Sequence, residues 1–81
     1  MTDLQLDQKI ERLKLRLATN LEEYRIKHGL TQVEMGNKCN IIQGKYSRIK
    51  NGKFHGITVE FLIKLNLKVD TGFHLIDMKD Y

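Results

Sequence analysis

The sequence predicts an all-α protein, a compact arrangement of four to five helices that ends in one short strand. Two short segments, at 31–39 and 43–51, are predicted as helices joined by a tight turn. A long apolar periodicity precedes this pair, and a second one follows it at 58–69. Apolar residues that recur at spacings of three and four share one face of a helix, so each of these segments is predicted to bury one face.

Length and composition indicate one folded domain that covers residues 1–81. The chain has 81 residues, of which 41% are hydrophobic and 30% are charged, a balance typical of soluble globular proteins. No apolar run reaches the length of a membrane span, and the first residues lack the order of a signal peptide. The single cysteine, Cys39, cannot form an internal disulfide. These features favour a cytoplasmic protein.

The N-terminal segment from Leu4 to His28 is predicted to be helical. It can be one helix, or two with a break near Thr19. Residues 4–16 are predicted to be a helical extension of the domain. The apolar stripe can cover the core of its own chain or form half of a dimer interface. We favour packing within the chain for Leu17 onward and contact with another subunit for Leu6 to Leu13. Gly29 is suited to ending the segment. The apolar stripe consists of Leu6, Ile10, Leu13, Leu17, Leu21 and Tyr24.

The pair of short helices follows directly. Thr31 is predicted to cap a helix that runs to about Cys39, and Asn40 suits a left-handed turn. Gly52 is predicted to end the second helix of the pair. Helices this short are unstable alone, so both depend on packing. The residues expected to face the interior are Met35, Cys39, Ile41, Tyr46 and Ile49.

Positive charge is concentrated in the middle of the chain. The whole chain carries a formal charge of +4. Between Met35 and Val59 there are cations and no carboxylate, while the remainder of the chain is close to neutral. A local basic patch indicates a polyanionic partner, although a solvated basic surface would have the same composition. The cations of this window are Lys38, Lys45, Arg48, Lys50 and Lys53.

The C-terminal part is predicted to be a helix followed by a strand. Thr58 is expected to cap the helix, and residues 70–72 to end it. The strand at 73–78 has no second strand in this chain to pair with. Unpaired strand edges are open to another chain, so the segment predicts a homodimer in which two copies pair. The proposed dimer contacts are Phe73, His74, Leu75, Ile76 and Met78.

Catalysis and metal binding are not expected. His28, His55 and His74 are far apart in the sequence, and no cysteine or histidine spacing suits zinc. Cys39 is at a core position, where a small buried hydrophobe is the ordinary role. We therefore expect no enzyme activity, no metal and no cofactor.

The central residues resemble the phage-repressor and xenobiotic-response-element (Cro-type) helix-turn-helix family. The match is carried by GLTQ at 29–32 and by YSRIKNGK at 46–53, and it covers roughly residues 17–69. The resemblance implies a repressor-like DNA-binding domain with its helix-turn-helix at 31–51. A short chain ending in a strand is also similar to the antitoxin-type repressors of this family, in which the C-terminal strands pair and the repressor also binds a toxin.

The resemblance implies a role for each exposed residue of this unit. Gln43 is expected to read a base, Gln32 to contact phosphate and support Gln43, and Lys45 and Arg48 to reach guanine or phosphate. Arg48 could instead pair with Glu34 or Glu60, and Phe54 could be a core lid or a partner contact. The full set of expected DNA contacts is Thr31, Gln32, Gln43, Gly44, Lys45, Ser47, Arg48, Lys50, Asn51 and Lys53.

Three residues depart from the pattern of the family. Gly36 stands where alanine is usual, because two helices approach closely there. Ile42 replaces the usual serine or threonine cap, so either Asn40 caps the helix or its first turn stays loose. Gly44 removes a side chain from the expected recognition face.

The function expected is a homodimeric repressor that reads a palindromic operator in double-stranded DNA through residues 43–51. It would be bacterial or phage-encoded and associated with the nucleoid. The alternative is an antitoxin whose main task is to neutralise a toxin protein. No contact with a membrane is expected.

Overall fold

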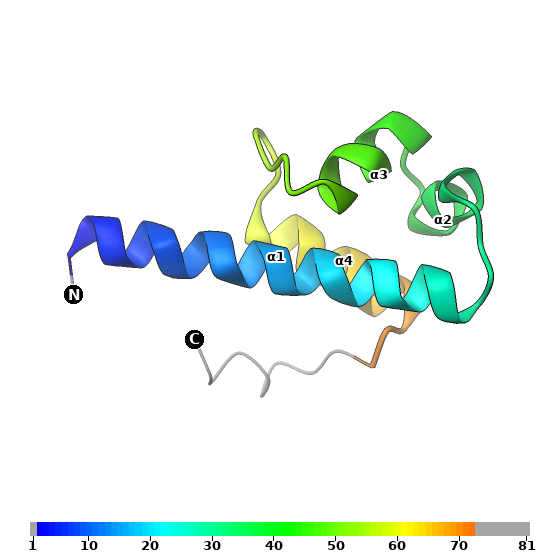
Figure 1. Ribbon diagram of the computed structural model, residues 1–81, viewed down its shortest axis with the longest axis horizontal. Coiled ribbons are helices and arrows are strands. Elements are labelled where there is room, and N and C mark those ends of the chain that lie inside the picture. The colour runs from blue at the N-terminus through cyan, green and yellow to red at the C-terminus, as the bar shows by residue number, and fades with distance from the viewer. Residues whose placement is uncertain (1, 73–81) are drawn as a thin grey trace.

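The computed structural model describes residues 2–72, and within them every regular element is a helix (Figure 1). The helices are α1 (Asp3–Lys27), α2 (Gln32–Cys39), α3 (Gln43–Lys50) and α4 (Val59–Val69). The prediction of an all-α fold is therefore confirmed. The predicted strand at 73–78 lies outside the described residues. None of the described helices has the length and apolarity needed to cross a membrane.

α1 is one continuous helix of 25 residues, without a break at Thr19. Its start is fixed by a capping box, in which the Thr2 side chain accepts from the Gln5 backbone and the Gln5 side chain accepts from the Thr2 backbone. Leu13 is only 8% exposed and belongs to the core. Leu13, expected to contact another subunit, therefore packs in the core of its own chain. Residues 3–12 extend beyond the other helices (Figure 1).

The turn between α2 and α3 has the predicted form. Thr31 caps α2 in a second capping box with Glu34, and Asn40 adopts the left-handed conformation with φ 59°. A Cβ atom at Gly36 would lie 3.0 Å from the Ile41 carbonyl oxygen and 3.5 Å from the Gln43 nitrogen. The helices therefore approach closely enough at this point that only a very small side chain fits.

The core lies where α1 and α4 meet the helix pair. α4 is capped by the Thr58 side chain, as predicted. Phe54 is 7% exposed, so it is a core lid. Burial raises the pKa of the Cys39 thiol to about 11, which keeps it protonated and unreactive near neutral pH. The core comprises Leu13, Leu17, Ala18, Leu21, Met35, Cys39, Tyr46, Ile49, Phe54, Ile57, Leu62, Leu65 and Val69.

Asn66 is a fully buried polar residue that joins α4 to α1. Its side-chain nitrogen donates to the Leu17 carbonyl at 3.1 Å and to the Leu62 carbonyl at 2.8 Å. Its side-chain oxygen accepts from the Thr71 hydroxyl at 2.7 Å. A buried amide is tolerated only when it is hydrogen-bonded in this way. These bonds fix the position of α4 along α1.

We expect Asn66→Ala to lower the free energy of unfolding by about 2–3 kcal/mol. The change removes these hydrogen bonds and leaves a small cavity. Denaturant titration measures the loss, and Asn37→Ala, at an exposed position of α2, is the matched control with an expected change within about 0.5 kcal/mol. Equal stability of the two variants would show that Asn66 does not join the helices.

Candidate nucleic-acid interface

α3 is held by its buried face, which leaves the opposite face open. Tyr46 and Ile49 are fully buried, whereas Gln43, Gly44 and Arg48 are exposed. No side chain caps the helix at Ile42. The first turn nevertheless closes, because the Ile42 carbonyl accepts from Lys45 at 3.1 Å and from Tyr46 at 3.2 Å. The expected cap from Asn40 is therefore absent.

Two glutamine side chains meet at the start of α3. The Gln43 side-chain nitrogen donates to the Gln32 side-chain oxygen at 3.0 Å. Both residues are in the first turn of their helices, α2 and α3. The bond uses one of the two hydrogens on the Gln43 nitrogen, so the other hydrogen and the carbonyl oxygen remain available. Gln43 thus presents one donor and one acceptor side by side in an exposed position.

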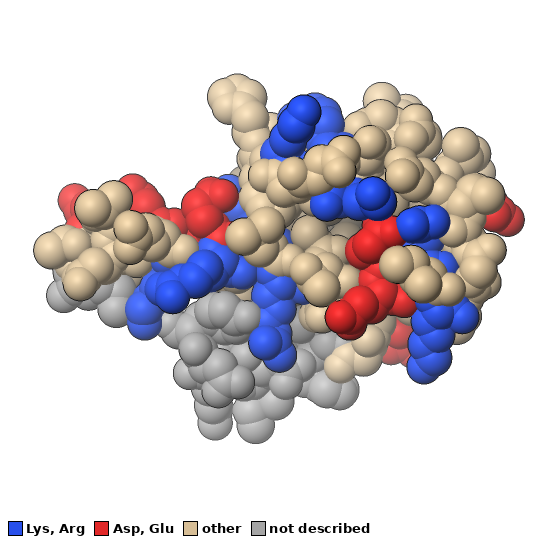
Figure 2. Space-filling view, viewed as in Figure 1, with Lys and Arg blue, Asp and Glu red and all other residues tan. Residues whose placement is uncertain are grey.

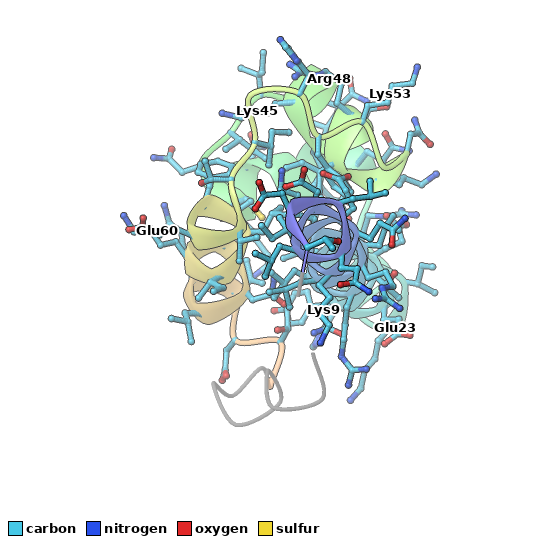
Figure 3. The ribbon with its side chains drawn as sticks, turned by 90° about the vertical axis from the view of Figure 1, so that its left-hand side faces the viewer. Lys9, Glu23, Lys45, Arg48, Lys53 and Glu60 are labelled. Atoms are coloured by element: carbon cyan, nitrogen blue, oxygen red, sulfur yellow. The ribbon has the colours of Figure 1, made fainter. Side chains whose placement is uncertain are left out.

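The cations gather on the same side of the molecule. Figure 2 shows Lys and Arg side chains around α3 and the loop after it, and Figure 3 shows Lys45, Arg48 and Lys53 on that side, away from Glu23. Lys50 and Lys53 are exposed. Three cations of the basic window predicted from the sequence, Lys45, Arg48 and Lys53, therefore lie on one side of the molecule.

Two of these cations also hold the surface in place. The Lys45 ammonium lies 4.3 Å from the centre of the Phe61 ring in α4, a favourable cation–π distance. The Arg48 guanidinium donates to the His55 carbonyl at 2.7 Å. Neither of the suggested pairs with Glu34 or Glu60 forms, and Glu60 instead pairs with Lys64 at 3.4 Å.

The remaining predicted contacts surround this surface. The Asn51 side-chain nitrogen lies 3.5 Å from the Ser47 hydroxyl. Thr31 is exposed, and its hydroxyl accepts from the Glu34 backbone at 3.1 Å. A Cβ atom at Gly44 would meet nothing within 4 Å, so the backbone is open to a close approach at that point.

A polar cluster on α1, formed by Glu22 and Arg25, holds α3 in position through Tyr46. The Tyr46 hydroxyl donates to one Glu22 oxygen at 2.9 Å, and Arg25 donates to the other. Arg25 also donates to the Leu30 carbonyl at 2.8 Å. The cluster therefore ties α3 and the residue before Thr31 to the same helix.

Electrostatics favours the charged form of Glu22. Partial burial alone would raise the pKa of this carboxyl group, but hydrogen bonds from Arg25 and Tyr46 and the charges of Arg25 and Lys50 outweigh it. The pKa therefore lies below its ordinary value of 4.5. Burial, together with the hydrogen bond to Glu22, raises the pKa of the Tyr46 phenol, so the hydroxyl stays protonated and donates.

Sequence reasoning missed Glu22, Arg25 and Ile42. Glu22 and Tyr46 are 24 positions apart in the chain, and no local pattern indicates such a contact. Ile42 was predicted only as a residue unable to cap. Its side chain is 77% exposed directly before Gln43. An apolar residue at a helix cap position was the sequence feature that could have singled out Ile42 as an exposed apolar side chain.

Comparison with known proteins agrees with this geometry. Residues 1–75 match a family of helix-turn-helix domains, and the chain belongs to that family. No curated protein and no solved structure matches it. Within residues 2–72, no group of histidine, cysteine and acidic residues could hold a metal ion. Helix-turn-helix domains place their second helix in the major groove of DNA, and α3 is the second helix of the α2–α3 pair in this chain.

We expect Glu22→Gln to destabilise the protein by about 1–2 kcal/mol at neutral pH, since charged hydrogen bonds become neutral ones. A carboxyl group with a lowered pKa in the folded protein stabilises it above the pKa of the unfolded state. That contribution is lost as the pH falls through the folded pKa. The difference between wild type and variant should therefore shrink below the ordinary value of 4.5.

Denaturant titrations across this pH range measure the difference. Glu23→Gln is the matched control, because Glu23 is the next residue in α1 and is exposed. A Glu22→Gln effect that stays constant at every pH would contradict the assignment.

Proposed function

We propose that this protein is a sequence-specific regulator of transcription, a homodimeric repressor of the Cro-type branch that reads a palindromic operator. The observation that carries the proposal is the Gln32–Gln43 amide pair, exposed at the start of α3 beside a surface of cations. A glutamine with a free donor and acceptor can pair with both polar atoms on the major-groove edge of adenine. The hydrogen bond from Gln43 to Gln32 restricts the directions in which the free donor and acceptor of Gln43 can point.

The other polar residues of this surface fit contacts to the DNA backbone. Lys50 and Lys53 are exposed. Ser47 lies in α3, and Asn51 is the C-cap residue of the same helix, four positions later. Contacts to phosphate fix the register of a protein on DNA, whereas contacts to base edges specify the sequence. Gly44 and Thr31 complete the surface, Gly44 by allowing the backbone to approach and Thr31 by lying at the start of α2.

Lys45 and Arg48 are assigned to the edge of the interface. Arg48 gives one of its donors to His55, and a guanidinium group has five. It can therefore hold the loop and a phosphate together. Lys45 lies over Phe61, so its ammonium is beside α4. We assign it to phosphate or guanine at that side.

The homodimer is proposed to include pairing of the segment 73–78, with contacts from Phe73, His74, Leu75, Ile76 and Met78. The alternative function is that of an antitoxin, based on the resemblance to the antitoxin-type repressors. Purification of the tagged protein from its native host distinguishes the two, because a stoichiometric partner protein favours an antitoxin. Either function is that of a cytoplasmic, nucleoid-associated protein that is not an enzyme.

Salt dependence tests the proposed DNA contacts. Each phosphate contact should contribute about −0.9 to the slope of log affinity against log salt concentration. Lys50→Ala and Lys53→Ala should each make the slope shallower by about 1. Fluorescence anisotropy at several salt concentrations measures it, and Lys64→Ala in α4 is the matched control with an unchanged slope. Binding that does not respond to salt would refute the proposal.

Gln43→Ala should relax specificity at one base pair by about 1–3 kcal/mol, since the paired donor and acceptor are lost. Gln32→Ala should weaken the same discrimination. The two losses should not add in the double variant, because Gln32 acts through its bond to Gln43. Competition binding with single base-pair substitutions measures all three variants. A uniform loss over every sequence would show that Gln43 is not a reading residue.

A further inference from the structure

The first half of α1 presents an apolar stripe outside the core. Leu6 is 45% exposed and Ile10 is 43% exposed. They continue the line of Leu13 and Leu17, which are buried, at spacings of four, three and four. We call residues 3–12 the α1 overhang, because none of them is buried and the segment projects beyond the other helices (Figure 1).

The overhang is built as a stable helix end. In its capping box, the Thr2 nitrogen donates to the Gln5 side chain at 2.8 Å, and the Gln5 nitrogen donates to the Thr2 hydroxyl at 3.2 Å. The overhang is the first part of α1, a continuous helix of 25 residues, and in proteins the stability of a helix comes mostly from packing of its apolar face. A capped overhang with an apolar stripe is therefore explained by a partner that packs against Leu6 and Ile10.

The overhang is unsuited to binding DNA on the side where α3 lies. Figure 2 shows carboxylate groups along its upper side, which is the side where α3 lies. The acidic residues of this segment are Asp3, Asp7 and Glu11. Negative charge on that side repels phosphate, so the overhang does not extend the basic surface, and its apolar stripe is left for another protein surface.

We propose that the partner is a second copy of this chain, whose overhang packs antiparallel against the first. The stripe continues towards the C-terminal end of α1 under α4, to which Asn66 joins it at Leu17. A partner helix in the parallel direction would run into α4. An antiparallel partner runs away from it, so that the two domains lie at opposite ends of the pair.

The spacing that results suits the proposed function, on which this part of the inference rests. α3 packs on α1 between Leu15, 3.4 Å from a Cβ atom placed at Gly52, and Glu22, which bonds Tyr46. A twofold axis through the middle of the overlap lies about 16 Å from this contact along α1, because a helix rises about 1.5 Å per residue. The two α3 helices are then about 32 Å apart, close to the roughly 34 Å between successive major grooves.

The same axis turns both recognition helices towards one side. In an antiparallel pair, the twofold axis is perpendicular to the helices and to the direction in which they face each other. Figure 3 looks along α1 and shows α4 to one side of it and α3 above it. The apolar stripe faces the side of α4, so the twofold axis points towards α3. Both α3 helices therefore face the same side.

Sedimentation tests the pairing without DNA. The wild type should sediment as a dimer, with twice the chain mass of 9.5 kDa. The double variant Leu6→Glu with Ile10→Glu should sediment as a monomer. Leu4→Glu is the matched control and should remain a dimer, because Leu4 is in the same overhang and 68% exposed, but it lies off the stripe. Circular dichroism checks that each variant is folded.

If the glutamate variant loses helix content, Leu6→Ala with Ile10→Ala replaces it, because alanine favours helix. This pair should weaken dimerisation at least tenfold. A monomeric wild type, or a stripe variant that dimerises as well as Leu4→Glu, would overturn the inference. A dimer lost only on removal of 73–81 would do the same, and would assign the interface to the C-terminal segment.

Orientation is tested by spin labels at Lys27→Cys in a Cys39→Ala background. The antiparallel pair places the two labels about 57 Å apart, whereas a parallel pair places them side by side. A short distance would overturn the antiparallel arrangement. These experiments distinguish failure of the interface from failure of the proposed function. A dimer that forms through the overhang but binds no DNA would refute only the proposed repressor function. A DNA-binding dimer that the stripe variants leave intact would refute only this interface.

Discussion

The hydrogen bond between the Tyr46 hydroxyl and Glu22 determines where the recognition helix lies. α3 is too short to be stable alone, and its fully buried tyrosine has one polar atom to satisfy. Glu22 accepts that bond, and Arg25 holds Glu22 while it also binds the Leu30 carbonyl. One cluster on α1 thus sets the position of α3 and of the chain entering α2.

The second constraint is the close approach of the two short helices. Gly36 has no room for a larger side chain beside the Ile41 carbonyl, and Asn40 takes the left-handed turn that brings α3 back. This approach puts Gln32 within hydrogen-bonding distance of Gln43. The amide pair gives the start of α3 an anchor that the absent cap at Ile42 does not supply. The proposed reading residue is therefore positioned by backbone geometry in the turn.

The helices could be predicted from the sequence because capping residues and apolar spacing mark them locally. Thr31 and Thr58 cap their helices as predicted, and apolar spacing identified most of the core. Long-range polar contacts had no such signal, which is why the bonds from Glu22 to Tyr46 and from Asn66 to Leu17 were missed. The Gln32–Gln43 contact was anticipated only through the family resemblance. The tethers of Lys45 and Arg48 depend on how α4 and the loop pack, which residue types alone do not show.

Selection of bound duplexes from a random library tests the central claim most directly, since α3 is proposed to read DNA as one of a pair. The account predicts an enriched palindrome whose two half-sites lie one helical turn apart, about 10 base pairs from centre to centre. Each half-site should contain an adenine whose replacement is tolerated by Gln43→Ala. The absence of any enriched sequence, or enrichment of single half-sites without twofold symmetry, would contradict it.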